Sequence, residues 1–173
     1  MMSLSELFLD GNNLGQSIPS SLGGVTQLAD LRLFENRLTG TLPLSLGNLS
    51  LLRVLYIDTN LLSGTIPTEF GGIVALKDFQ AYDNSLEGTI PTEIGNLENL
   101  ISLVLSGNEM IGSIPPNICN GGKLEKIDLT GNTLFGTIPD MSNCAQLRRL
   151  HLSRNTIDGD IPKSIGNLTH LSE

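Results

Sequence analysis

The chain has 173 residues, with 10 Lys and Arg against 18 Asp and Glu and a formal net charge of −8. This length fits one domain, and the acidic balance excludes a nucleic-acid-binding surface, which needs a dense face of Lys and Arg. A hydrophobic fraction of 39% is too high for a disordered acidic chain, and no apolar run approaches the roughly 18 residues that a membrane-spanning helix needs. We therefore expect a folded domain that binds no nucleic acid and does not insert into a membrane.

The amino-terminal residues, Met1-Met2-Ser3-Leu4-Ser5-Glu6, lack the basic stretch and apolar core of a secretory signal. The protein is then either intracellular or a segment of a longer chain. Cys119 and Cys144 are too few for a disulfide framework and lack the paired spacing of a zinc site. A disulfide between them and two buried thiols both remain open.

A repeat runs through the whole chain. Asparagine recurs at a spacing of 24 residues five times and then 23, and a proline follows each of these asparagines by seven residues. The asparagines are Asn12, Asn36, Asn60, Asn84, Asn108, Asn132 and Asn155. An asparagine position and a proline position that keep the same spacing through seven repeats predict a solenoid. In such a fold each coil buries its apolar residues against its neighbours.

Each coil is expected to open with a short strand. Apolar residues five and three positions before the asparagine, such as Leu31 and Leu33 before Asn36, have the period of two of a strand with one buried face. The asparagine amide should then be buried at the corner and hydrogen-bond the backbone that leaves the strand. In six of seven coils a glycine follows the asparagine by four residues, and Gln16 is the exception. Glycine suits a backbone bend whose conformation is unfavourable for residues with a Cβ.

We place these coils within a single array over residues 1–173. Their expected bounds are 4–27, 28–51, 52–75, 76–99, 100–123, 124–146 and 147–170. The fourth coil has Phe79 and Ala81 where the other coils mostly carry Leu or Ile, which we interpret as a volume-conserving exchange.

The segments 31–43 (LRLFENRLTGTLP) and 55–67 (LYIDTNLLSGTIP) resemble plant-type leucine-rich repeats. The resemblance covers essentially the whole chain, and the Gly-Thr-Ile-Pro half distinguishes this subclass. It implies an α/β solenoid: a right-handed superhelix of about seven coils, with a parallel sheet on its concave face and short extra strands beside the Gly-x-Ile-Pro turn. It also implies short helical turns on the convex side, as over residues 46–49.

Members of this family normally carry cysteine-bearing caps at both ends of the array. Here Leu4 already occupies the first strand, and the chain stops two residues after Leu171. We therefore expect an array that is uncapped at both ends and belongs to a longer protein.

The concave surface is the expected binding site, because strand residues that do not face the core project onto it. Exposed aromatic side chains among polar groups are typical of a recognition surface. The candidate ligand-binding residues are Phe8, Arg32, Phe34, Tyr56, Asp58, Gln80, Tyr82 and Asp83. Towards the other end the same face becomes basic, through Lys126, Arg148, Arg149, His151 and Arg154.

A non-catalytic module that binds a protein or peptide, as part of a receptor-like protein, is the favoured function. One alternative is a secreted inhibitor similar to those that block cell-wall polygalacturonases, with a microbial hydrolase as partner; a receptor would instead have a co-receptor as a further partner. Another alternative is ice binding, suggested by a column of mostly hydroxyl residues five positions after the asparagine. Its members are Ser17, Thr41, Thr65, Thr89, Ser113, Thr137 and Asp160.

The sequence predicts no enzyme, cofactor or metal. The sequence spacing places no Ser or Cys nucleophile beside His151 or His170. The glycines recur once or more in each coil and do not form a glycine-rich phosphate-binding loop. Asp58 and Asp83 would suit a glycosidase pair, but an open sheet excludes little water.

Two glycosylation sequons begin at Asn48 and Asn167 and are expected on the convex side. They favour secretion only slightly, whereas the resemblance favours it more. We therefore expect an extracellular or cell-surface location as part of a longer protein, with a cytoplasmic location as the alternative.

Overall fold

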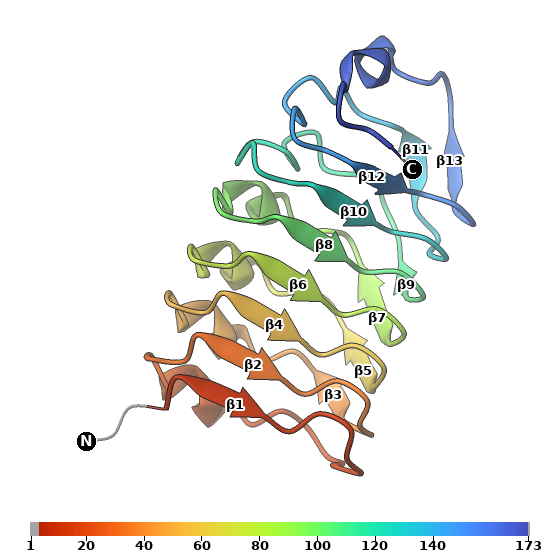
Figure 1. The fold of residues 1–173 in the computed structure, drawn as a ribbon. Helices are drawn as coiled ribbons and strands as arrows, with labels where there is room; N and C mark the ends of the chain where they lie inside the picture. The colour runs from red at the N-terminus through yellow and green to blue at the C-terminus, as the bar shows by residue number, and fades with distance from the viewer. Residues whose placement is uncertain (1–3, 173) are drawn as a thin grey trace.

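The computed structural model describes residues 4–172, which form a stack of similar coils (Figure 1). Each coil contributes one three-residue strand to a seven-stranded parallel sheet, ordered β1-β2-β4-β6-β8-β10-β12. These strands are β1 (Glu6–Phe8), β2 (Asp30–Arg32), β4 (Val54–Tyr56), β6 (Asp78–Gln80), β8 (Ser102–Val104), β10 (Lys126–Asp128) and β12 (Arg149–His151). The expected solenoid is confirmed.

The strands pair in the register that the repeat dictates. Leu31 aligns with Leu55, and Leu55 with Phe79, so equivalent positions of neighbouring coils lie side by side. All three side chains are fully buried, whereas their flanking strand residues face outward and are half-buried. The alternation thus places one residue of each inner strand in a continuous apolar core, as the period of two predicted.

A second row of strands lies beside the turn in which glycine and proline recur at a fixed spacing. It contains β3 (Thr39–Thr41), β5 (Leu61–Gly64), β7 (Ser85–Gly88) and β9 (Glu109–Met110) in one sheet and β11 (Phe135–Thr137) and β13 (Thr156–Asp158) in another. The expected extra strands are therefore present. The glycine column has positive φ, for example +74° at Gly64, and Gln16 adopts the same conformation with φ of 68°.

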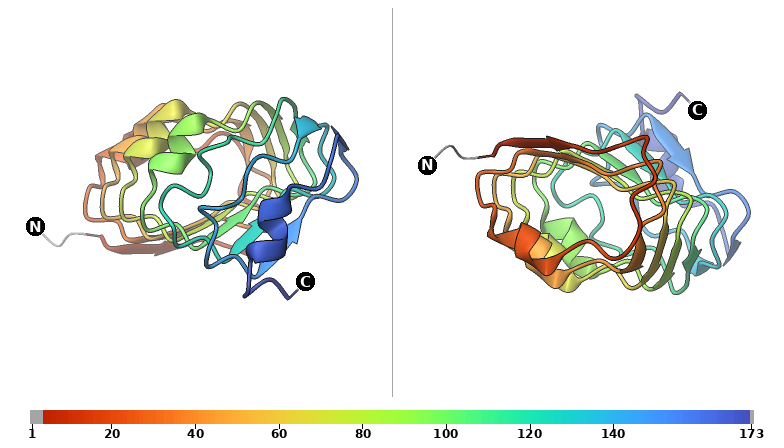
Figure 2. Two further views of the ribbon diagram at one scale, coloured as in Figure 1. Left: turned by 90° about the horizontal axis from the view of Figure 1, so that it is seen from above. Right: turned by 90° about the horizontal axis from the view of Figure 1, so that it is seen from below.

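The helical turns on the opposite side are 3-10 helices. They are η1 (Ser20–Gly24), η2 (Leu44–Asn48), η3 (Thr68–Gly72), η4 (Thr92–Asn96) and η5 (Lys163–Asn167). Each follows a proline of the repeat in extended conformation, which fixes the direction in which the helix begins. Figure 2 shows these turns across the coil from the seven-stranded sheet. No helix within residues 4–172 is long and apolar enough to span a bilayer.

The fifth and sixth coils depart from this pattern, since turns replace the 3-10 helix over residues 116–122 and 142–146. Cys119 and Cys144 form a disulfide there, with a Cα–Cα distance of 5.1 Å. The pairing that the sequence left open is thus settled as a bridge between consecutive coils.

The asparagine column forms a ladder of hydrogen bonds between coils. The Asn60 side-chain amide donates to the carbonyl oxygens of Leu33, Ile57 and Asp58 at 3.0–3.1 Å, and its Oδ1 accepts from the Leu38 N–H at 2.9 Å. Asn60 is buried, and so are Asn108 and Asn132. The prediction of a buried corner is confirmed for these three coils, whereas Asn36, Asn84 and Asn155 are half-buried. It is wrong for Asn12, which is exposed because the described chain places no preceding coil over it.

Candidate ligand-binding face

The outward surface of the seven-stranded sheet, together with the turn after each strand, carries the candidate binding residues. We call it the concave face. Its side chains belong to the strand positions that alternate with core leucines, so neighbouring coils present them about 4.8 Å apart. The candidate residues from Phe8 to Asp83 all lie on its first four coils.

Arg32 is held between aromatic rings of the two adjacent coils. Its guanidinium carbon lies 4.7 Å from the ring centroid of Phe8 and 5.4 Å from that of Tyr56. Two hydrogen bonds of 2.9 and 3.0 Å join the same guanidinium to the Asp30 carboxylate. Asp30 raises the pKa of Arg32 through this hydrogen bond. Arg32 is therefore already engaged within the face and is not a free cation.

Tyr56 joins this stack to a second aromatic contact. Its ring lies 6.4 Å from that of Phe34, in an edge-to-face arrangement with an interplanar angle of 65°. Both rings are half-buried, and Phe8 at the end of the row is 50% exposed. The structure thus brings Phe8, Arg32, Phe34 and Tyr56 together into one continuous cluster.

Asp58 differs from expectation. The sequence predicts an exposed acidic side chain, but Asp58 is only 2% exposed, and its Oδ1 is buried without a hydrogen-bond partner. Burial raises the pKa of its carboxyl, and the charge of Glu35 adds to this effect. The hydroxyls of Tyr82 and Thr59 and its own backbone act in the opposite direction. In the register of the coils Asp58 lies between Phe34 and Tyr82, and Tyr82 is close enough to affect its pKa.

The tyrosines share this environment. Burial raises the pKa of Tyr82 most, followed by its hydrogen bond to Asp58 and the charge of that residue. Burial also raises the pKa of Tyr56, with the nearby carboxylate of Asp78 adding to the shift. Burial raises the pKa of Asp78 itself. The first four coils therefore combine half-buried rings with carboxylates that are disfavoured as anions.

The turn after each strand adds Asp83 to the candidate residues. Asp83 is exposed and has a φ of 49°, and Glu35, Thr59 and Arg154 adopt the same left-handed conformation at the equivalent position. Glycine occupies this position in three other coils, and in the sequence it indicates the left-handed backbone conformation there. Gln80 lies at the end of β6 and is half-buried.

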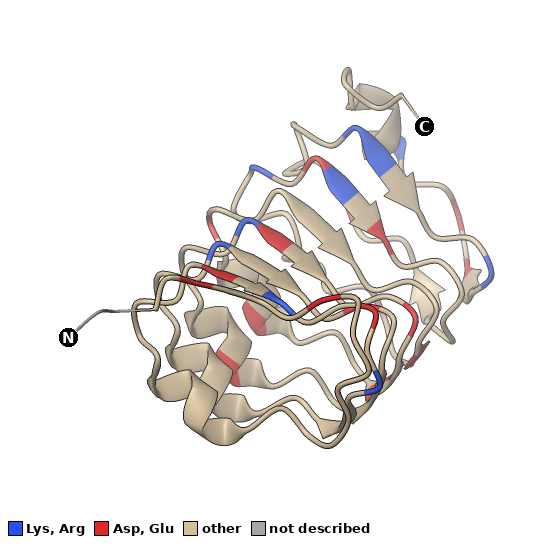
Figure 3. Cartoon of the chain, turned by 60° about the horizontal axis from the view of Figure 1, so that its bottom comes forward, with Lys and Arg blue, Asp and Glu red and all other residues tan. Residues whose placement is uncertain are grey.

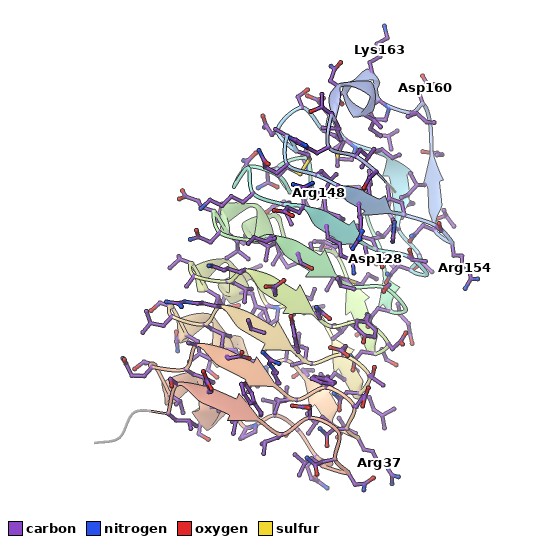
Figure 4. All side chains as sticks on the ribbon, in the orientation of Figure 1. Arg37, Asp128, Arg148, Arg154, Asp160 and Lys163 are labelled. Atoms are coloured by element: carbon purple, nitrogen blue, oxygen red, sulfur yellow. A yellow bond between two sulfur atoms is a disulfide. The ribbon has the colours of Figure 1, made fainter. Side chains whose placement is uncertain are left out.

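The later coils of the concave face have a different character. Val104 and Ser102 on β8 are buried and separate the aromatic cluster from the basic residues of the last two coils. Arg148 pairs with Glu125 at 3.2 Å, and His151 Nδ1 lies 3.6 Å from an Asp128 carboxylate oxygen. Figure 3 shows the cationic segments on the strands near the carboxyl end, and Figure 4 labels Asp128, Arg148 and Arg154 there.

A groove beside the 3-10 helices was not among the predicted sites. It has a volume of about 970 Å³ and is lined by the Ser/Thr-Ile/Leu-Pro segments of the first three coils. Ser17, Thr41 and Thr65 lie on its wall, and their side chains are exposed. The repeated Ser/Thr-Ile/Leu-Pro segment is its signal in the sequence, and its three hydroxyl residues belong to the column that suggests ice binding.

The two sequons lie on the convex side, as expected. Asn48 and Asn167 are the last residues of η2 and η5, and both are exposed. Within residues 4–172, no group of three or more His, Cys, Asp or Glu side chains is arranged to hold a metal ion.

Comparison with known proteins gives the family. The model described as "Leucine Rich Repeat" matches residues 3–25, 27–49, 51–73, 99–120, 123–144 and 146–168. The fourth coil, with Phe79 and Ala81, lies outside these ranges. A search of curated proteins found no match.

Solved structures extend the likeness to particular proteins. The ectodomain of the Arabidopsis thaliana receptor kinase GASSHO1/SCHENGEN3, in complex with CASPARIAN STRIP INTEGRITY FACTOR 2, is 38% identical with a TM-score of 0.95, covering 97% of this chain and 20% of that one. The plant peptide hormone receptor RGFR1, in complex with RGF2, is 36% identical with a TM-score of 0.93, covering 94% and 26%. A plant ice-binding protein is 29% identical with a TM-score of 0.79, covering 89% and 50%.

The present chain therefore spans about a fifth to a quarter of the length of these receptor structures. Family-model matches over most of the sequence, a stack of parallel strands and the asparagine ladder agree with one another. The chain belongs to the leucine-rich repeat family.

Proposed function

We propose that this chain is a non-catalytic recognition segment of a receptor-like protein and binds a protein or peptide on its concave face. The observation that carries the proposal is the aromatic cluster of Phe8, Arg32, Phe34 and Tyr56, set among carboxylates on the first four coils. Interface energy is concentrated in a few aromatic and arginine anchors, and this cluster supplies such anchors in a fixed arrangement. The peptide-hormone complex of RGFR1 supports the same choice of ligand.

An extracellular location is part of the proposal. The disulfide between Cys119 and Cys144 supports it, because such bonds persist in oxidising compartments and are rare in the cytosol. The similarity to plant receptor ectodomains points the same way. Glycans at the exposed Asn48 and Asn167 would lie across the coil from the concave face and leave it free.

A random peptide library displayed on phage provides the test, with the purified chain as bait. Binders enriched on the native chain are then measured by calorimetry against Tyr56→Ala/Tyr82→Ala. We expect the double variant to weaken binding by at least about 2 kcal/mol, because both rings serve the face and not the core. Unfolding curves establish that it remains folded.

Glu69→Gln/Glu93→Gln is the matched control, since both residues lie in the first turn of 3-10 helices on the convex side. It should leave the affinity unchanged. Binding that survives the tyrosine changes and is lost with the convex pair would place the site on the outer surface.

Ice binding is a second candidate, favoured by one observation. The side chains of Ser17, Thr41, Thr65, Thr89, Ser113 and Thr137 are all exposed and form a hydroxyl column along the flank. The similarity to a plant ice-binding protein supports this reading. Thermal hysteresis of the native chain that disappears in Thr65→Leu/Thr89→Leu would establish it, and its absence at high protein concentration would remove it.

A further inference from the structure

Asp58 raises a question that the fold alone does not answer. Its Oδ1 is buried and has no hydrogen-bond partner, on the face that the proposed function assigns to the ligand. Buried polar atoms in native proteins nearly always have partners, and each exception calls for an explanation. A carboxylate kept in this state costs stability, which is typical of residues retained for binding.

The surroundings of Asp58 restrict the chemistry of any partner. Phe34 and Tyr82 occupy the equivalent positions of the two adjacent coils, and Tyr56 precedes Asp58 on the same coil. The charges near it are acidic: Glu35 raises the pKa of Asp58, and Asp58 raises the pKa of Tyr56. An anion would be repelled here, and a neutral apolar group would leave Oδ1 without a partner.

The neighbouring stack already contains the complementary arrangement. Arg32 lies between the rings of Phe8 and Tyr56, with Asp30 accepting two hydrogen bonds from its guanidinium. Along the next column, two rings again flank a central residue, but that residue is the carboxylate of Asp58. Arg32 is committed to Asp30, so it does not neutralise Asp58.

We propose that Asp58, with Phe34, Tyr56 and Tyr82, forms a subsite for a cationic side chain of the bound protein or peptide. This inference rests on the proposed function and names the chemistry of its ligand. The cation takes the place of the Tyr82 hydroxyl beside the carboxylate, donates to the unpartnered Oδ1 and lies against the rings. Arginine suits the subsite better than lysine, because its planar guanidinium stacks on aromatic faces and donates two parallel hydrogen bonds to a carboxylate.

The tyrosines make the subsite directly observable. The chain has two tyrosines, and both belong to the subsite. In protein labelled with ¹³C on the tyrosine rings, both resonances should shift saturably on titration with Nα-acetyl-arginine amide. Nα-acetyl-citrulline amide has nearly the same shape without the charge, and at matched ionic strength it should leave both resonances in place.

Asp58→Asn should weaken the response to the arginine probe at least tenfold while remaining folded, as unfolding curves check. Glu87→Gln removes the same charge from an exposed side chain on β7 and should bind the probe like the native chain. Equal responses to arginine and citrulline, an unaltered response in Asp58→Asn, or no saturable shift below about 0.1 M arginine probe would each overturn the subsite. None of these outcomes bears on the phage-selected peptides, whose loss in Tyr56→Ala/Tyr82→Ala tests the proposed function separately.

Discussion

Two polar residues of the third coil show how position decides the effect of burial. Asn60 is buried with its amide donating to three carbonyl oxygens and its Oδ1 accepting a backbone N–H. Asp58, two residues earlier, is buried with one oxygen unpaired. Each satisfied hydrogen bond contributes about 1 kcal/mol, whereas an unpaired buried group costs roughly 1–3 kcal/mol. Asn60 therefore stabilises the coil and Asp58 opposes it.

Asp58→Asn should make the protein more stable at neutral pH. Burial raises the folded-state pKa of Asp58, so the folded chain holds this proton more tightly than the unfolded chain does. The stabilising contribution of the protonated form is complete below the unfolded pKa of about 3.9 and is lost as the pH rises through the folded value. The free energy of unfolding should therefore rise by about 1 kcal/mol at pH 7 in the variant.

Denaturant titrations from pH 3 to pH 8 measure this effect. The gain should vanish towards the acidic end, where both chains are neutral at this position. Glu87→Gln corrects for the general benefit of reducing the net charge of −8. A gain that is the same at every pH would show that the Asp58 carboxylate is not penalised by burial.

At the scale of elements, close approach of η1, η2 and η3 to the next 3-10 helix depends on one glycine in each of the three. A Cβ at Gly47 of η2 would come within 2.3 Å of the Glu69 carbonyl oxygen on η3, and one at Gly23 of η1 would meet Ser45 on η2 at 2.2 Å. The fifth and sixth coils have Cys119 and Asn143 at this position of the repeat, and they form no 3-10 helix. The glycine thus sets the spacing at which neighbouring coils stack.

Gly47→Ala should lower the free energy of unfolding by about 2 kcal/mol, because backbone atoms of η3 would have to move away. Gly24→Ala is the matched control, since a Cβ there would meet nothing within 4 Å. The control should be neutral or slightly stabilising through the reduced entropy of the unfolded chain. Thermal unfolding of both variants measures the difference. Equal losses of stability in the two variants would mean that the spacing between the 3-10 helices does not cause the loss.

For the whole molecule, each coil contacts its neighbours, so stability depends on the interfaces between coils. The disulfide reinforces the interface where the 3-10 helices are missing, by joining Cys119 and Cys144 across a sequence separation of 25 residues. The charges are also divided along the molecule: residues 1–100 carry 4 basic and 11 acidic side chains, against 6 and 7 in residues 101–173. A ligand of uneven charge would therefore be oriented along the array.

Cys119→Ala/Cys144→Ala should lower the free energy of unfolding by about 3.5 kcal/mol, the chain-entropy value for a loop of 25 residues. Hydrogen exchange should show the largest loss of protection in coils five to seven, on both sides of the missing bridge. The native chain treated with a reductant should behave like the variant, and the variant should not respond to reductant. Uniform loss of protection along all coils would contradict a local role for the bond.

The sequence by itself determined the solenoid. Its 24-residue period dictates which positions of successive coils align, and apolar alternation decides which of them enter the core, as with Leu31, Leu55 and Phe79. The asparagine ladder followed from the same columns, because its partners lie at fixed offsets in the preceding coil. The aromatic members of the candidate face could be placed on one surface for the same reason.

Only the tertiary structure decided what each of those surface residues experiences. Asp58 is buried at a place where Phe34 and Tyr82 are its neighbours in register. Arg32 is engaged because Phe8, Tyr56 and Asp30 surround it. The disulfide likewise depends on how two coils of unequal length stack. Periodicity fixes the direction in which a side chain points, whereas burial, pairing and pKa depend on the size and charge of neighbours about 24 residues away in the sequence.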